Sequence, residues 1–68
     1  MSISQLAKKI RQKRKKIGLS QDKLSKLADV AYNTVVKIES GENHNPTIET
    51  LTKIAKALGI SVGDLFKK

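Results

Sequence analysis

Apolar positions along the chain recur every three or four residues, the spacing of the buried face of an α-helix. No stretch alternates apolar and polar residues for long enough to predict a strand. Glycines at 18, 41, 59 and 63 and a proline at 46 divide the pattern into segments. The sequence therefore predicts one all-α domain over residues 1–68, a compact arrangement of five helices. Their expected ranges are about 3–16, 21–28, 32–40, 47–58 and 62–67.

Each expected helix carries apolar residues for a shared core. They are Ile3, Leu6, Ala7, Ile10 and Ile17 in the first helix, Leu24, Leu27 and Ala28 in the second, Val35 and Ile38 in the third, Ile48, Leu51, Ile54, Ala55 and Leu58 in the fourth, and Val62, Leu65 and Phe66 in the last. We expect Leu65 in the core, whereas Phe66 suits core and surface equally. Ser20 and Thr47 stand where N-caps are expected, and Ser61 with Asp64 resembles a capping box.

The second and third predicted helices fit a helix-turn-helix, because they span Gln21 to Ser40 with a link of only about three residues. If the third helix turns Val35 and Ile38 inward, its outward residues are Tyr32, Asn33, Val36, Lys37 and Ser40. Asn can pair with an adenine edge, Lys can reach guanine acceptors, and an apolar side chain can contact a thymine methyl. The alternative is an ordinary solvated helix face, which does not need an exposed tyrosine and valine. Candidate base-reading residues are thus Tyr32, Asn33, Val36 and Lys37.

The formal charge of +8 and the pI near 10.1 indicate a polyanionic partner. Residues 1–16 contain seven cations and no acid, so the excess lies in one N-terminal block. Such a block is also compatible with a solvated helix face. The apolar stripe of this first helix is needed for the core, which argues against binding to an anionic membrane.

The composition has few of the residues that metal binding, disulfide bonding and thiol catalysis require. With no cysteine and one histidine, the chain offers no disulfide framework, Cys-ligated zinc site, thiol nucleophile or His-rich metal cluster. We therefore expect no enzyme activity, no metal and no cofactor. The apolar runs are too short for a membrane span, and charges occupy the place of a signal peptide's apolar core. The expected location is cytoplasmic.

A series of short segments occurs in a characteristic order. They are Ile10 to Gly18 (IRQKRKKIG) with its Arg14, then Leu19-Ser20-Gln21, Val35 to Gly41 (VVKIESG), Asn45-Pro46-Thr47, Ile54 to Gly59 (IAKALG), and finally Leu65. From about Ile3 to Phe66 the chain resembles the Cro and phage-repressor type (XRE-like) helix-turn-helix DNA-binding family. The resemblance implies a lambda-repressor-like fold and a sequence-specific transcriptional regulator, in the first place a repressor.

The chain departs from the family pattern at three positions. Ser25 stands where alanine is usual, Asp29 where the turn has glycine, and Ala31 where a serine or threonine often caps the third helix. Ser is nearly as small as Ala, and Asp tolerates a left-handed backbone better than most residues. The missing cap at Ala31 costs the third helix about 0.5–2 kcal/mol.

The resemblance also implies contacts with the DNA backbone. Gln21 and the amides that open the second helix are expected to hold a phosphate, and the loop that follows the third helix is expected to lie along the backbone. Candidate phosphate-binding residues are Gln21, Ser40, Asn43, His44 and Asn45. From the basic block, Arg11, Lys13 and Lys15 are expected to attract phosphate as distributed charge rather than as fixed contacts. For His44, a solvated loop side chain is an equally good interpretation.

Arg14 continues the apolar stripe of the first helix, four residues after Ile10 and three before Ile17. Its guanidinium is therefore expected to be partly buried and to need a carboxylate. Glu39, next to the inward Ile38, is the best candidate, and the resembled family pairs the same two positions. We expect a semi-buried structural ion pair between the first and third helices.

The expected partner is double-stranded operator DNA. One recognition helix covers too few base pairs to mark a genomic site, so two copies are expected on half-sites one helical turn apart. We expect a weak homodimer, or a monomer that pairs on DNA, through the loop Asn43 to Pro46 and the apolar residues near Phe66. Alternatives are an antitoxin that binds its promoter and a toxin, or a protein-binding transcriptional adaptor. Exposed Tyr32, Asn33 and Lys37 favour direct reading of DNA.

Overall fold

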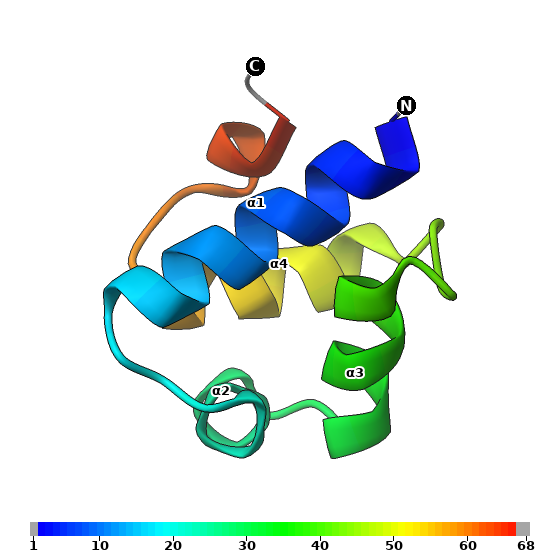
Figure 1. Cartoon of the computed structure of the whole chain (residues 1–68). Coiled ribbons are helices and arrows are strands. Elements are labelled where there is room, and N and C mark those ends of the chain that lie inside the picture. Colours follow the sequence, from blue (N-terminus) through cyan, green and yellow to red (C-terminus); the bar gives the residue numbers. More distant parts are fainter. Residues whose placement is uncertain (1, 67–68) are drawn as a thin grey trace.

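The computed structural model describes residues 2–66, with side chains from residue 5 onward. It contains α1 (Ser2–Lys16), α2 (Gln21–Ala28), α3 (Tyr32–Ser40), α4 (Ile48–Ala57) and a short 3-10 helix η1 (Val62–Phe66) (Figure 1). Over this range there is no strand, which confirms the all-α class. α1 packs against α3 and η1, α2 against α3 and α4, and α4 against η1. The two short helices α2 and α3 therefore pack against each other, with α4 behind α2 and α1 behind α3.

The fifth predicted helix differs from the expectation in type. Over the described residues the chain forms four α-helices and one 3-10 helix rather than five α-helices. The helix η1 is only five residues long and includes Gly63, a length and composition typical of 3-10 pieces. Residue 67, the last of the expected range, lies outside the described part.

Side-chain caps define the beginnings of α2, α4 and η1 as the sequence predicts. Ser20 Oγ accepts from the Lys23 amide at 3.0 Å, and Thr47 Oγ1 accepts from the Thr50 amide at 3.1 Å. Ser61 and Asp64 form a reciprocal pair: the Ser61 amide donates to Asp64 Oδ2 at 3.1 Å, and the Asp64 amide donates to Ser61 Oγ at 3.3 Å. These bonds satisfy backbone donors that a helix N-terminus leaves unpaired.

Three helices end with the same turn, in which one residue adopts the left-handed conformation. That residue is Gly18 (φ 76°), Asp29 (φ 58°) or Gly59 (φ 77°). The amide of the next residue then donates back to the helix at 3.0 Å: Leu19 to the Arg14 carbonyl, Val30 to Ser25 and Ile60 to Ala55. Each of these next residues is partly buried against the core. The turn thus ends the helix and supplies an apolar contact, as in a Schellman motif.

A single cluster of apolar side chains forms the core. Its buried members are Ile10, Leu24, Ala28, Val35, Ile38, Leu51, Ile54, Ala55, Leu58 and Leu65. All of these positions were expected from the helical spacing. Ala7 is also buried, Leu6 and Val62 are partly buried, and Phe66 is exposed. The side chain of Ile3 lies outside the described part.

Three predicted core positions are wrong, since Ile17, Leu27 and Ile48 are 51%, 61% and 65% exposed. Ile17 follows the last residue of α1, and Leu19 packs on the core instead, because the glycine turn redirects the chain. In α2, the buried face consists of Leu24, Ser25 and Ala28, and Leu27 lies beside that face. Ile48 is the first residue of α4, one turn before the buried Leu51.

Candidate nucleic-acid interface

The helix α3 lies along one edge of the molecule (Figure 1). Val35 and Ile38 are fully buried, and they fix the rotation of this helix about its axis. The side chains on the opposite face, Tyr32, Asn33, Lys37 and Ser40, are exposed, and Val36 is half-buried. Asn33 and Lys37 are four residues apart and so stand one above the other on the same face. Donors and acceptors of two residue types therefore point together away from the core.

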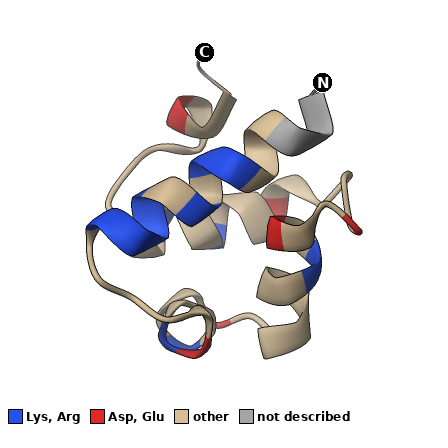
Figure 2. Ribbon diagram, in the orientation of Figure 1, with Lys and Arg blue, Asp and Glu red and all other residues tan. Residues whose placement is uncertain are grey.

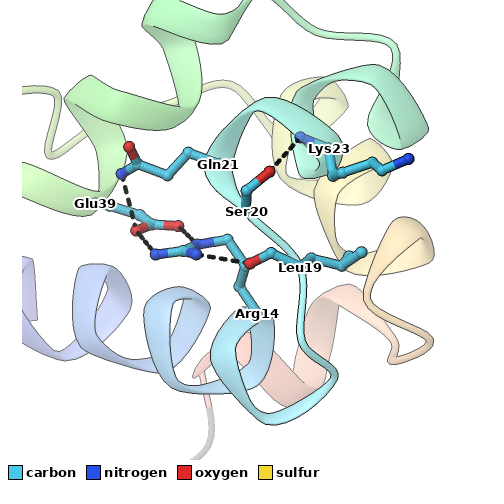
Figure 3. A network of polar contacts seen from close by, with 6 residues as sticks. All are labelled: Arg14, Leu19, Ser20, Gln21, Lys23 and Glu39. Atoms are coloured by element: carbon cyan, nitrogen blue, oxygen red, sulfur yellow. Dashed lines mark hydrogen bonds and ion pairs between the residues drawn. The ribbon is translucent and has the colours of Figure 1, made fainter.

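Arg14, Gln21 and Glu39 form a polar network that joins the three helices of this region (Figure 3). Arg14 Nε donates to Glu39 Oε2 at 2.6 Å, and its second terminal nitrogen donates to Glu39 Oε1 at 2.9 Å. The remaining terminal nitrogen donates to the Leu19 carbonyl at 2.7 Å. Gln21 Nε2 donates to Glu39 Oε1 at 3.1 Å. The structure thus brings together the two residues expected to pair, and adds two partners.

This ion pair is enclosed by the protein, since Arg14 and Glu39 are only 8% and 9% exposed. The hydrogen bonds to Glu39 raise the pKa of Arg14 above its ordinary value, the charge of Glu39 adds to this, and burial opposes it. Arg14 therefore keeps its positive charge. Among the described buried side chains, every nitrogen and oxygen has a hydrogen-bond partner. Arg14 and Glu39 thus form a bidentate ion pair whose polar atoms all have hydrogen-bond partners.

A hollow of about 440 Å³ opens beside this network, where α1, the start of α2 and the end of α3 meet. Its lining residues are Arg11, Arg14, Lys15, Gln21, Val36, Glu39 and Ser40. Since Arg14 is neutralised by Glu39, the exposed Arg11 and Lys15 leave the hollow with a net positive charge. Figure 2 shows that lysine and arginine continue along α1. The amides that open α2 add a helix N-terminus, which favours anions.

The loop after α3 has its own hydrogen bonds. The Asn43 amide donates to the Lys37 carbonyl at 2.9 Å, and Asn43 Oδ1 accepts from the Asn45 amide at 3.2 Å. Ser40 Oγ donates to the Lys37 carbonyl at 3.1 Å and accepts from the Glu42 amide at 3.2 Å. These bonds hold the loop against the end of α3 and leave His44 and Asn45 exposed.

The predicted phosphate-binding residues consequently fall into two groups. Arg11, Gln21 and Ser40 surround one hollow, whereas Asn43, His44 and Asn45 lie in the loop that follows α3. Of the three cations expected to attract phosphate as distributed charge, Arg11 and Lys15 line this hollow and Lys13 does not. The bond between Gln21 and Glu39 joins residues eighteen apart and leaves no local signal.

Within the described residues, no group of histidine, cysteine, aspartate and glutamate side chains could hold a metal ion. No helix of residues 2–66 is long and apolar enough to cross a membrane. A capped helix, a three-residue turn and a second helix with an exposed polar face define the fold and the site as those of a helix-turn-helix protein.

Comparison with known proteins agrees with this class. The sequence pattern of the helix-turn-helix family matches residues 10–65, and the chain belongs to this family. It is 36% identical over 58 residues to an uncharacterised HTH-type transcriptional regulator of Archaeoglobus fulgidus, which spans 85% of this chain and 81% of the relative.

Solved structures show the same fold. The restriction-modification controller protein C.AhdI from Aeromonas hydrophila has a TM-score of 0.89 and 30% identity, over 94% of this chain and 96% of its own. The N-terminal DNA-binding domain of SinR from Bacillus subtilis has a TM-score of 0.88 and 33% identity, over 93% and 91%. The fold also occurs in hydroxypropylphosphonic acid epoxidase from S. wedmorenis (TM-score 0.82, 27% identity), of which this chain spans only 35%. That partial match shows a shared domain and carries no argument for catalysis.

Proposed function

We propose that this protein is a sequence-specific DNA-binding regulator of transcription that acts as a repressor. The observation that carries the proposal is the exposed polar face of α3 beside a cationic hollow at the start of α2. Membership of the family and the likeness to the DNA-binding domain of SinR support it. The proposed function is DNA binding without catalysis.

In the proposed complex, α3 lies in the major groove. Asn33 pairs with an adenine edge, Lys37 with guanine acceptors, and Tyr32 and Val36 contact thymine methyl groups. These contacts select a sequence, because each base pair presents a different pattern of donors and acceptors in that groove. Bound over a promoter, the domain excludes other proteins from the same DNA, and this exclusion represses transcription.

Phosphate contacts on both sides of α3 fix its position in the groove. Arg11, Gln21, Ser40 and the first amides of α2 hold one phosphate region at the hollow. Candidate contacts from the following loop are Asn43, His44 and Asn45. The Arg14–Glu39 pair ties α1 to α3 and orients Gln21, so the distance between the phosphate anchor and the reading face is fixed. This rigidity lets phosphate binding set the register of base reading.

Two copies are needed for a unique site, because one α3 reads only a few base pairs. We propose a weak homodimer that forms on operator DNA with half-sites about 34–36 Å apart. Because the proposed partner is operator DNA, the proposed place of action is the cytoplasm. Sedimentation of the protein with a two-half-site duplex tests the assembly: two chains per duplex at saturation support it, and one chain contradicts it.

Selection of bound sequences from random duplexes tests the proposed function as a whole. A sequence-specific regulator enriches one consensus, and a dimer on DNA makes that consensus palindromic. A variant with Asn33→Ala and Lys37→Ala serves as the matched control, because both side chains are exposed and the fold does not depend on them. No enrichment over bulk DNA by the unchanged protein would contradict the proposal and favour an adaptor that binds proteins.

A further inference from the structure

A second hollow, of about 420 Å³, lies between the end of α2 and the later part of α4, two helices that pack against each other. Its lining residues are Leu27, Ala28, Lys53, Lys56 and Ala57, and we call it the α2–α4 groove. It shares no lining residue with the hollow at Gln21. Because Gln21 begins α2 and Leu27 lies near its end, the two hollows open at opposite ends of that helix.

The floor of the groove is apolar. Leu27 exposes more than half of its surface although a leucine contributes most when it is buried. The two alanines of the lining are small, so an incoming side chain can reach the helix backbones between Leu27 and α4. Burial of Leu27 by a partner would therefore remove apolar surface that the isolated chain leaves in water.

Positive charge borders this floor. Two of the five lining residues are lysines, and none is acidic. Lys56 is exposed, and the Nζ of Lys53 is 4.0 Å from Glu49 Oε2, a distance at the limit of an ion pair. On a surface such a contact contributes little, so both lysines can accept a better-placed carboxylate. The groove combines an apolar anchor site with cations at its edge.

We propose that the α2–α4 groove docks an acidic amphipathic helix of another protein. The helix inserts a large apolar side chain beside Leu27 and places carboxylates against Lys53 and Lys56. Helices that bind in grooves use apolar anchors spaced three and four residues apart, and complementary charges then select the partner. This binding activity goes beyond the proposed function, because it adds a protein ligand at a surface separate from the DNA-reading face.

Charge argues against the other occupants of this groove. A second copy of the chain, bound symmetrically through the same surface, would bring the lysines of both copies together. A nucleic acid would pair with the lysines but would gain nothing from an apolar floor. An acidic amphipathic helix matches both properties at once.

The first test is a titration of the isotope-labelled full chain, followed by NMR, with a synthetic peptide of about 18 residues, long enough for a helix. The peptide carries leucines on one helical face and flanking glutamates, and a matched peptide carries lysines in place of the glutamates. We expect amide shifts around Leu27, Lys56 and Ala57 with the acidic peptide only. Equal shifts with the basic peptide, or none at this groove with either, would overturn the proposal.

Variants then separate the groove from the rest of the surface. Leu27→Ser is expected to weaken peptide binding about tenfold or more, because it removes the apolar anchor. Lys53→Glu with Lys56→Glu is expected to exchange the preference, so that the basic peptide binds and the acidic one does not. Ile48→Ser is the matched control, since Ile48 is an exposed apolar residue of α4 outside the groove. If Ile48→Ser weakened binding as much as Leu27→Ser, the groove would not be the site.

Two further measurements exclude other occupants. Self-association in sedimentation that Leu27→Ser abolishes would identify a second copy, and groove shifts with phosphatidylglycerol vesicles but not with the peptide would identify a lipid surface. Either result overturns the proposal. DNA affinity is expected to be unchanged in Leu27→Ser, so failure of peptide binding and failure of DNA binding are distinguishable.

Discussion

Arg14 makes more hydrogen bonds to the rest of the fold than its neighbours in the basic block. Its guanidinium donates twice to Glu39 and once to the Leu19 carbonyl. Arg14→Met leaves the buried Glu39 carboxylate without its cation, and we expect the free energy of unfolding to fall by about 3–5 kcal/mol. Urea denaturation of the variant measures this loss.

A double variant provides the control for this prediction. When Arg14→Met is combined with Glu39→Met, no buried charge is left unpaired, and we expect most of the lost stability to return. A single variant as stable as the unchanged protein would contradict a structural role for the pair. A double variant less stable than the single would contradict the explanation by an unpaired charge.

Asp29 occupies the left-handed conformation at φ 58° in the turn between α2 and α3. Glycine adopts this conformation without a steric cost, whereas a β-carbon costs roughly 1–2 kcal/mol. The cost for aspartate lies between the two. We therefore expect Asp29→Gly to be the most stable protein, the unchanged protein to be intermediate, and Asp29→Ala to be the least stable. Thermal unfolding of the three proteins checks the order. An alanine variant as stable as the glycine variant would show that the turn does not impose this backbone.

Among the four α-helices, α3 begins without a side-chain cap. Ala31 has the extended backbone of an N-cap but no hydrogen-bonding side chain. Ala31→Ser supplies an oxygen for the first amides of α3, and we expect it to stabilise the domain by about 0.5–2 kcal/mol. Ser20→Ala removes the existing cap of α2 and serves as the matched opposite change. Unchanged stability in Ala31→Ser would show that another group already satisfies these amides.

Element by element, most of the fold could be predicted from the sequence, because helix starts and stops depend on local chemistry. Ser20 and Thr47 cap helices where expected, and glycine turns at Gly18 and Gly59 end α1 and α4. Exposure at Leu27 could not be predicted, because it depends on which face of α2 meets α4 rather than on spacing alone. The glycine turn after α1 likewise places Leu19, rather than the expected Ile17, against the core.

For the candidate site, the exposed residues could be predicted from the sequence, but the contacts between helices could not. Val35 and Ile38 fix the rotation of α3, so its outward residues could be identified from their spacing. The bond from Gln21 to Glu39 and the hollow shared by α1, α2 and α3 could not, because they exist only once the helices pack. The local sequence pattern thus predicts which side chains are exposed on α3, whereas the packing of the helices determines which side chains contact one another.

The net charge of +8 is expected to make the proposed binding to DNA depend on salt. Each phosphate contact by a cation contributes about 1 to the slope of log affinity against log salt concentration. Arg11→Gln with Lys15→Gln removes two cations at the hollow, and we expect the slope to fall by about 2. Fluorescence anisotropy across a salt series measures it.

The control for the salt series lies on another face. Lys53→Gln with Lys56→Gln removes the same charge from the α2–α4 groove, and we expect the slope to change little. If both double variants lowered the slope equally, overall charge rather than the hollow at Gln21 would account for the attraction to DNA.

The substitution Asn33→Ala tests whether the outward face of α3 reads DNA sequence. The measurement compares the affinities of the unchanged protein and the variant for a selected operator duplex and for a random duplex. We predict that the variant loses about 1–3 kcal/mol on the operator and almost nothing on random DNA, because Asn33 contacts a base edge. Gln21→Ala, at the proposed phosphate anchor, should weaken both complexes nearly alike. An equal loss on operator and random DNA in Asn33→Ala would contradict base reading by α3.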